Sequence, residues 1–270
     1  MRVSTALICA AIAVLGLGPA LAGPVDPGFR SSTFPANDDG ATAAVALGFS
    51  ADYFGTTYSN TFISNNGYLT FSGPQGTYTP SGLGASYTGQ PIIAAFFADV
   101  DTRGAGSGLT SYGTGTYAGH TAFGATWPGV GYYGLHVDKL NTFQIILTDR
   151  SDVGLGNFDI YLNYDQIQWE TGDASGGSGG LGGTSAAVGF NAGSGNAAGT
   201  YYQLPGSLVN GALIDGGPNS LIAGTNDGVT GQYLFQVRNG VIVVGTPEPV
   251  SIALLGVGLL GLAAVRRRKA

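Results

Sequence analysis

Residues 61–71 read TFISNNGYLTF, in which two asparagines and a glycine separate two short apolar segments. Asparagine and glycine tolerate the positive φ angles that tight hairpin turns require. We therefore predict two antiparallel strands, Thr61–Ser64 and Tyr68–Phe71, joined by a turn at residues 65–67. This hairpin indicates a β-sheet protein.

The same pattern of short strands and turns continues on both sides of the hairpin. Residues 91–100, PIIAAFFADV, form a continuous apolar run that suits a strand covered on both faces. A second hairpin is predicted at Asn239-Gly240. Apolar residues alternate with period two in three further segments, which predicts half-buried strands: Phe123, Ala125 and Trp127; Phe143, Ile145 and Leu147; and Phe158, Ile160, Leu162 and Tyr164.

Composition supports a packed all-β fold. The 270 residues include 48 glycines, but the glycines show no triplet period, and 11% of the residues are aromatic, so the chain is neither collagen nor disordered. We predict an antiparallel β-sandwich with glycine-rich loops, of which residues 172–184, mostly Gly and Ser, should be a mobile loop.

The two ends of the chain differ from this body in charge. The formal net charge is −6, but residues 23–249 contain five basic and sixteen acidic residues, a net charge of −11. An acidic body argues against a nucleic-acid partner, because phosphate binding needs a basic surface. The single cysteine, Cys9, lies outside this body, so the predicted exported protein has no disulfide.

Residues 1–22 have the three parts of a secretory signal, which we expect to be helical. Arg2 provides the positive start, residues 6–17 the apolar stretch, and Ala20-Leu21-Ala22 a small-x-small cleavage site. Signal peptidase is expected to cut between Ala22 and Gly23. The alternative is a buried N-terminal helix.

The C-terminal end carries a second apolar segment. Residues 250–265 are apolar and are followed directly by a basic cluster, Arg266, Arg267, Arg268 and Lys269. Sixteen residues are short for a membrane span, but long basic side chains reach the interface, so we predict a single transmembrane helix. The basic cluster should lie in the cytoplasm and the body outside the inner membrane.

Residues Pro247, Glu248 and Pro249 precede the apolar segment and should be extended and accessible. This order of Pro-Glu-Pro, short apolar helix and terminal arginines resembles the PEP-CTERM sorting signal. The resemblance implies recognition and cleavage by the membrane enzyme exosortase near residues 247–249. An ordinary tail anchor is the alternative.

Nine segments of the body follow a recognisable order along the chain: 54–58, 62–71, 91–94, 99–103, 126–132, 141–147, 164–169, 187–191 and 204–207. In this order they resemble the nidogen-like (NIDO) extracellular domain. The resemblance is collinear and strongest over residues 37–207, although Ala95-Phe96-Phe97 departs from the family pattern. It implies a non-catalytic matrix or adhesion module. We therefore expect three regions: a signal peptide at 1–22, a NIDO-like β-sandwich at 34–245 and a sorting signal at 246–270.

Asp99 and Asp101 are candidate ligands for a metal ion. Residues two apart in an extended chain project to one side, so both carboxylates could reach one hard cation such as Ca²⁺. Two structural alternatives remain: Asp101 could pair with Arg103, and Asp99 could end a strand and accept hydrogen bonds from loop amides. No other cofactor is expected, because two histidines without suitable partners do not make a zinc site.

Three functions remain open. The first is an exported, non-catalytic surface, extracellular-matrix or adhesion protein of a bacterium, whose partner is an extracellular polysaccharide or a surface protein. The second is a carbohydrate-binding module with aromatic side chains stacked on sugars, although Trp127 and Trp169 fall in core-like registers. A glycoside hydrolase built around Glu170 is a distant third. We expect no catalytic residues.

Overall fold

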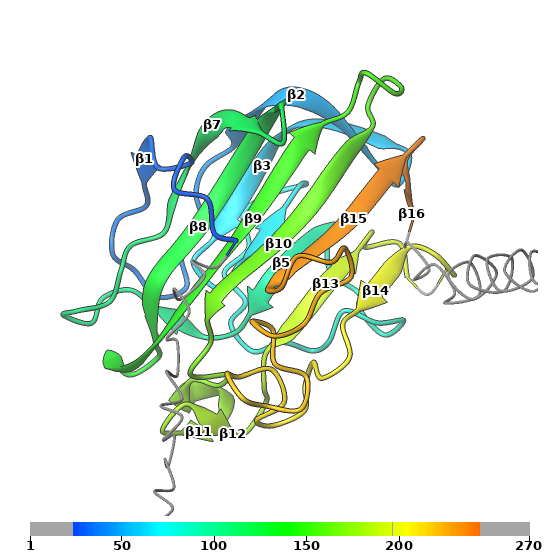
Figure 1. Ribbon diagram of the computed structural model, residues 1–270. Helices are drawn as coiled ribbons and strands as arrows, with labels where there is room; N and C mark the ends of the chain where they lie inside the picture. Colours follow the sequence, from blue (N-terminus) through cyan, green and yellow to red (C-terminus); the bar gives the residue numbers. More distant parts are fainter. Residues whose placement is uncertain (1–23, 196, 244–270) are drawn as a thin grey trace, which may run out of the picture.

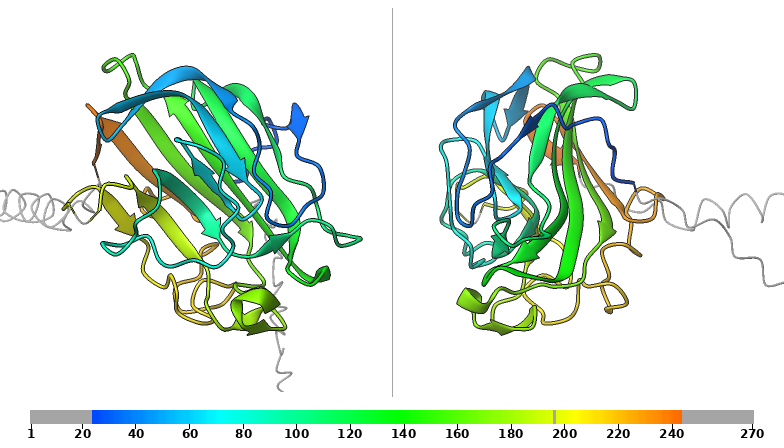
Figure 2. Two further views of the ribbon diagram at one scale, coloured as in Figure 1. Left: turned by 180° about the vertical axis from the view of Figure 1, so that it is seen from behind. Right: turned by 90° about the vertical axis from the view of Figure 1, so that its left-hand side faces the viewer.

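The computed structural model describes residues 24–195 and 197–243, which form two antiparallel β-sheets stacked face to face. Figure 1 shows the larger sheet in front, and the right-hand view of Figure 2 shows the two layers edge-on. The predicted all-β sandwich is confirmed. Within the described ranges no helix is long and apolar enough to cross a membrane. The predicted signal helix (1–22) and transmembrane helix (250–265) lie outside the described residues.

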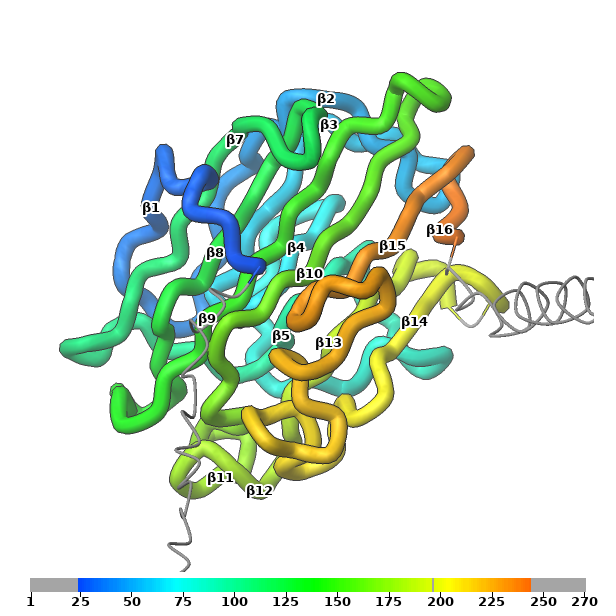
Figure 3. Tube along the Cα trace, in the orientation of Figure 1, coloured from blue at the N-terminus to red at the C-terminus, as the bar shows by residue number. Residues whose placement is uncertain are grey.

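The larger sheet has eight strands in the order β1-β7-β8-β9-β10-β15-β16, with β6 paired to β8. Its longest strands, β8 and β9, form a hairpin at the centre. Figure 3 shows β15 beside β10, although 65 residues separate the two strands in the chain (167–231). The strands are β1 Ser32–Thr33, β6 Val100–Asp101, β7 Ser111–Tyr117, β8 His120–Tyr132, β9 His136–Asp149, β10 Phe158–Gln166, β15 Gln232–Arg238 and β16 Val241–Val243.

The smaller sheet has six strands in the order β14-β13-β5-β4-β3-β2. The predicted hairpin at residues 61–71 is confirmed as β3 and β4, in which Ser64 pairs with Tyr68 and Gly67 has φ 83°. The strands are β2 Val45–Tyr53, β3 Thr56–Ser64, β4 Tyr68–Thr70, β5 Ile92–Phe97, β13 Ala187–Asn191 and β14 Tyr201–Gln203.

The apolar run 91–100 is not one strand. Its first part is β5, which is buried on both faces as predicted, but the chain then crosses to the larger sheet, where β6 pairs with β8. Ala98 and Asp99 make this crossover. The periodicity of an apolar run does not show where such a change of sheet occurs, because both parts are equally buried.

The core lies between the sheets and contains the alternating residues that the sequence predicts to face inward. Trp127 and Trp169 are fully buried there, and Phe96 of the smaller sheet contacts Phe143 and Trp169. The predicted second hairpin is also confirmed as β15 and β16, with Arg238 paired to Val241 and Asn239 at φ 52°.

The glycine-rich segment 172–184, predicted to be a mobile loop, contains defined secondary structure. It forms a short 3₁₀ helix, η1 (Asp173–Ser175), and a two-stranded ribbon of β11 (Gly177–Ser178) and β12 (Leu181–Gly182). The Gly180 carbonyl accepts hydrogen bonds from the backbone amides of Glu170 and Thr171, which attaches this ribbon to the end of the core.

Candidate metal centre

The loop at residues 37–40 lies against the crossover between the sheets. Asn37 and Thr102 exchange hydrogen bonds: the Asn37 amide donates to Thr102 Oγ1 at 2.9 Å and the Thr102 amide donates to the Asn37 carbonyl at 3.0 Å. The Asn65 amide donates to the Gly40 carbonyl at 2.8 Å. The loop is therefore fixed on one side by the β3–β4 turn and on the other by the residue after β6.

Asn66 connects this loop to the crossover. Its Nδ2 donates to Asp39 Oδ1 at 2.9 Å, and its Oδ1 accepts from the Val100 amide at 3.0 Å. Its carbonyl accepts from the Ala98 amide at 3.3 Å. The turn that the sequence predicts thus positions residues on both sides of Asp99.

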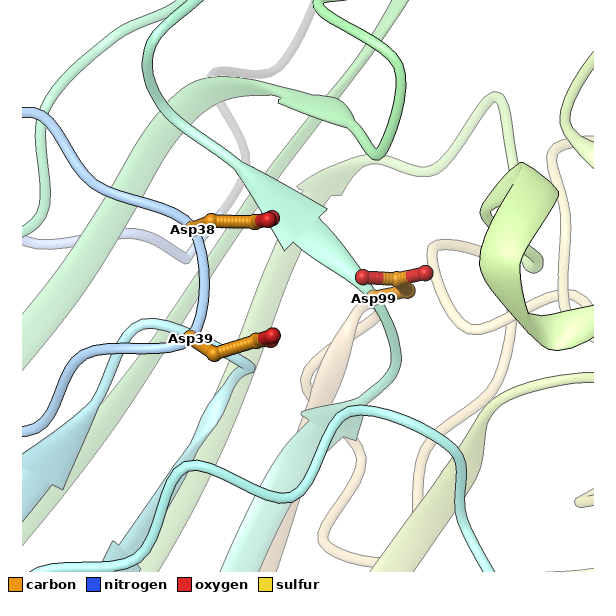
Figure 4. A group of neighbouring side chains, drawn as sticks. All are labelled: Asp38, Asp39 and Asp99. Atoms are coloured by element: carbon orange, nitrogen blue, oxygen red, sulfur yellow. The ribbon is translucent and has the colours of Figure 1, made fainter.

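Asp38, Asp39 and Asp99 meet at this point, and one carboxylate oxygen from each lies within 4.8 Å of the others. Figure 4 shows Asp38 and Asp39 pointing from their loop toward Asp99. Asp99 is 1% exposed, and no described residue donates a hydrogen bond to either of its carboxylate oxygens. The predicted bonding of Asp99 to loop amides is therefore wrong.

Asp101, the other candidate ligand, has its oxygens occupied. The Arg103 amide and Nε donate to its Oδ1, both at 2.9 Å, while Arg103 Nη2 donates to Oδ2 at 2.8 Å. The Leu135 amide also donates to Oδ2 at 3.1 Å. The predicted pairing of Asp101 with Arg103 is confirmed, and the structure groups Asp99 with Asp38 and Asp39 instead.

The pKa values follow from this arrangement. Burial, followed by the negative charges of Asp38 and Asp39, raises the pKa of Asp99 to about 7. Burial and the neighbouring Asp39 raise the pKa of Asp38 to about 6, despite an ion pair of 3.0 Å with Arg103. Burial acts on Asp101 too, but the hydrogen bonds from Arg103 and Leu135 hold its pKa below the usual range.

Asp38 and Asp39 are the residues that the sequence interpretation missed. Their only local signal is a pair of adjacent carboxylates in a turn-like segment, Asn37-Asp38-Asp39-Gly40. Such segments are common in loops. Their approach to Asp99 depends on contacts between residues about 60 positions apart in the chain.

Glu170 has a structural position. It is fully buried, and its carboxylate accepts hydrogen bonds from the Gly211 amide at 2.6 Å and the Leu213 amide at 2.5 Å. Burial raises its pKa, and these amides oppose the shift. Both oxygens bind the backbone of the loop 211–213, which gives the residue a role in holding this loop.

A concave site lies beside β14. It has a volume of about 440 Å³, and its lining includes Tyr202 and Tyr233 together with the polar residues Asn219 and Asn226. The two tryptophans do not contribute to it, since both are buried in the core. Stacking of a sugar in this site would therefore use tyrosine.

The remaining predicted site residues lie outside the described ranges. They are the residues of the signal and sorting segments: Ala22, Gly23, Pro247, Glu248, Pro249, Arg266, Arg267, Arg268 and Lys269.

Comparison with known proteins matches two family models. The nidogen-like domain model matches residues 59–239, and the PEP-CTERM protein-sorting motif matches residues 246–269. Mouse alpha-tectorin (Mus musculus) is 31% identical over 225 residues, which cover 75% of this chain and 10% of the relative. Drosophila melanogaster nidogen is 29% identical over 221 residues, 74% of this chain and 15% of the relative. No solved structure matches significantly.

The fold and the site define the chain as a two-sheet antiparallel β-sandwich with an acidic cluster at the crossover between the sheets. The chain belongs to the nidogen-like domain family and carries a PEP-CTERM sorting motif at its C-terminal end. It spans 10–15% of the length of the curated relatives it matches. Both matches fit a secreted or cell-surface protein.

Proposed function

We propose that this chain is a non-catalytic surface or extracellular-matrix protein of a bacterium, exported by its signal and sorted by exosortase. The observation that carries the proposal is the order of the two matches, a nidogen-like domain at 59–239 followed directly by a PEP-CTERM motif at 246–269. The sorting motif supports processing by exosortase, and the domain family supports a role in adhesion or matrix assembly.

In this proposal, signal peptidase removes residues 1–22, and residues 250–265 hold the C-terminus in the inner membrane before processing. The Arg266–Lys269 cluster keeps the orientation with the body outside. Cleavage near Pro247–Pro249 then separates the β-sandwich from its anchor. The body contains no cysteine and has a net charge of −11, from five basic and sixteen acidic residues. Such a charge favours solubility outside the cell, where the body would bind extracellular polymer or a surface protein.

Replacing Pro247, Glu248 and Pro249 together with alanine tests the processing step. We expect the variant to stay in the membrane fraction with its C-terminus intact, whereas the unmodified chain loses the residues after the cleavage point. Mass spectrometry of the C-terminal peptide from each fraction distinguishes the two. Pro218→Ala, at an exposed loop proline, is the control and should be processed normally. An unmodified chain that ends at Ala270 in the extracellular fraction would contradict the proposal.

Carbohydrate binding is the second candidate function, and the concave site beside β14 favours it. Tyr202, which is half-buried, offers part of an aromatic side chain, Tyr233 is only 7% exposed, and the asparagines offer hydrogen-bonding groups, the combination that sugar recognition uses.

Tyr202→Ala is expected to weaken retention of the full chain on extracellular polysaccharide by roughly 2- to 12-fold, since a lost stacking contact is worth about 0.5–1.5 kcal/mol beyond the buried area. Tyr201→Ala is the matched control, because Tyr201 is the adjacent residue of β14 and does not line the site. Equal retention of both variants, measured in a pull-down, would assign binding to another surface. If the chain instead degrades the polysaccharide, and substitution of a single Asp or Glu abolishes that degradation, the protein is a hydrolase.

A further inference from the structure

We infer that Asp38, Asp39 and Asp99 form a binding site for a hard divalent cation of the size of Ca²⁺. Calcium binds carboxylate oxygens at about 2.3–2.6 Å, so two ligands of one ion lie at most about 5 Å apart. One oxygen from each of these three residues lies within 4.8 Å of the others. A single ion can therefore contact all three, and water can complete its shell.

Asp99 provides the second observation that points to a ligand. Four carboxylates are buried among the described residues: Asp99, Asp101, Asp159 and Glu170. Asp101 is bound by Arg103, Asp159 by two arginines at 2.9 and 2.6 Å, and Glu170 by two backbone amides. Both Asp99 oxygens lack any such donor within residues 24–195 and 197–243. A buried carboxylate without a partner is costly, and a cation supplies the missing interaction.

The nearby positive charge of Arg103 does not pair with Asp99. Arg103 Nη2 lies 3.0 Å from Asp38 Oδ2 and 2.8 Å from Asp101 Oδ2, so it is shared between those two residues. Asp38 Oδ1 has no hydrogen-bond partner among the described residues and remains for the ion. Asp39 Oδ1 is oriented by Asn66 Nδ2 at 2.9 Å and keeps its second oxygen.

The surrounding backbone restricts what can approach Asp99. A Cβ atom at Gly172 would lie 2.6 Å from Asp99 Oδ2, so this carboxylate lies directly against the backbone of the segment before η1. The ion would connect three parts of the fold: the loop 37–40, the crossover from β5 to β6 and, through Asn66, the β3–β4 turn. Its expected effect is to hold the two sheets together at their crossover.

The test uses the full chain in detergent, first treated with a chelator and then titrated with CaCl₂. We expect a dissociation constant of about 10⁻⁴–10⁻³ M, the range of extracellular calcium modules. At about 10 mM Ca²⁺ the melting temperature should rise by roughly 3–10 °C. MgCl₂ at the same concentration should give a smaller rise, because Mg²⁺ demands a stricter octahedral geometry.

The variant Asp99→Asn tests whether Asp99 is a metal ligand or has only a structural role. The variant should lose the Ca²⁺ response, yet its metal-free form should melt above the metal-free parent, because the substitution removes a repelling charge. Asp39→Asn, at an exposed position, should lose the response without a folding defect. Asp152→Asn is the matched control: Asp152 is a half-exposed carboxylate on the β9–β10 loop, and its variant should respond like the parent.

The inference is overturned if about 10 mM Ca²⁺ leaves the melting temperature of the parent unchanged and calorimetry shows no heat of binding. A Ca²⁺ response that survives in both Asp99→Asn and Asp39→Asn overturns the assignment of these ligands. A larger rise with Mg²⁺ than with Ca²⁺ overturns the assignment of the ion. None of these results depends on C-terminal processing, so they are independent of the proposed sorting.

Discussion

Gly67→Ala is expected to destabilise the β-sandwich by about 2–6 kcal/mol. Gly67 ends the β3–β4 turn with φ 83°, a conformation that costs an L-residue roughly 1–3 kcal/mol. An added Cβ would also lie 1.9 Å from the carbonyl oxygen of Phe96 and 3.3 Å from the ring of Phe143. The clash is with the backbone, and its relief would displace β5, so we expect a further loss of roughly 1–3 kcal/mol.

Gly55→Ala is the control for this substitution. Gly55 has the same φ of 83°, but a Cβ there would meet no atom within 4 Å. The difference between the two variants in the free energy of unfolding, measured by denaturant titration of the full chain, therefore isolates the clash. Equal losses would show that the contact between the turn and Phe96 is looser than the structure describes.

Trp127→Ala is expected to cost about 3–5 kcal/mol of stability. Trp127 of β8 is fully buried, and its ring stacks on Phe143 with centroids 5.1 Å apart and an interplanar angle of 15°. Its Nε1 donates to the Asn65 carbonyl at 2.9 Å, which attaches the core of the larger sheet to the turn of the smaller one. The substitution leaves both a large cavity and an unpaired buried carbonyl.

Trp127→Phe separates these two contributions. It keeps an aromatic ring but removes the donor, so its loss should be smaller, about 1–3 kcal/mol for the unpaired carbonyl together with the reduced volume. Leu155→Ala is the control, because Leu155 is 93% exposed on the β9–β10 loop and its variant should stay within about 0.5 kcal/mol of the parent. A Trp127→Ala loss below about 0.5 kcal/mol, the range of ordinary surface changes, would contradict the described packing.

Local sequence predicts the strands of this fold well, for a physical reason. The side chains of a half-buried strand alternate between apolar and polar, and a tight turn needs residues that accept positive φ. Both features depend on consecutive residues, so they can be recognised in the local sequence. The hairpins β3–β4 and β15–β16 follow such patterns and are confirmed. The inward residues of β8, β9 and β10 also lie in the core as predicted.

The segment 172–184 shows where local patterns fail. Its glycines and serines indicate a chain with few side chains to bury, yet it forms η1 and the β11–β12 ribbon. Backbone hydrogen bonds to Glu170 and Thr171 determine this structure, and composition carries no information about such bonds. The break in the run 91–100 has a related cause: whether a segment joins one sheet or the other depends on the distant strand with which it pairs, β4 for β5 and β8 for β6.

The sequence by itself determined the class of this protein: an all-β body of the nidogen-like family, a PEP-CTERM motif at the C-terminal end and core positions for Trp127 and Trp169. Only the tertiary structure decided how the acidic side chains are grouped. Asp99 and Asp101 are two residues apart, yet Arg103 binds one while Asp38 and Asp39 approach the other. Strand periodicity specifies which side chains share a face, but the crossover after β5 ends that periodicity. Hydrogen bonds from Asn65 and Asn66 then bring the loop 37–40 to the crossover, and no local pattern in the sequence specifies these contacts.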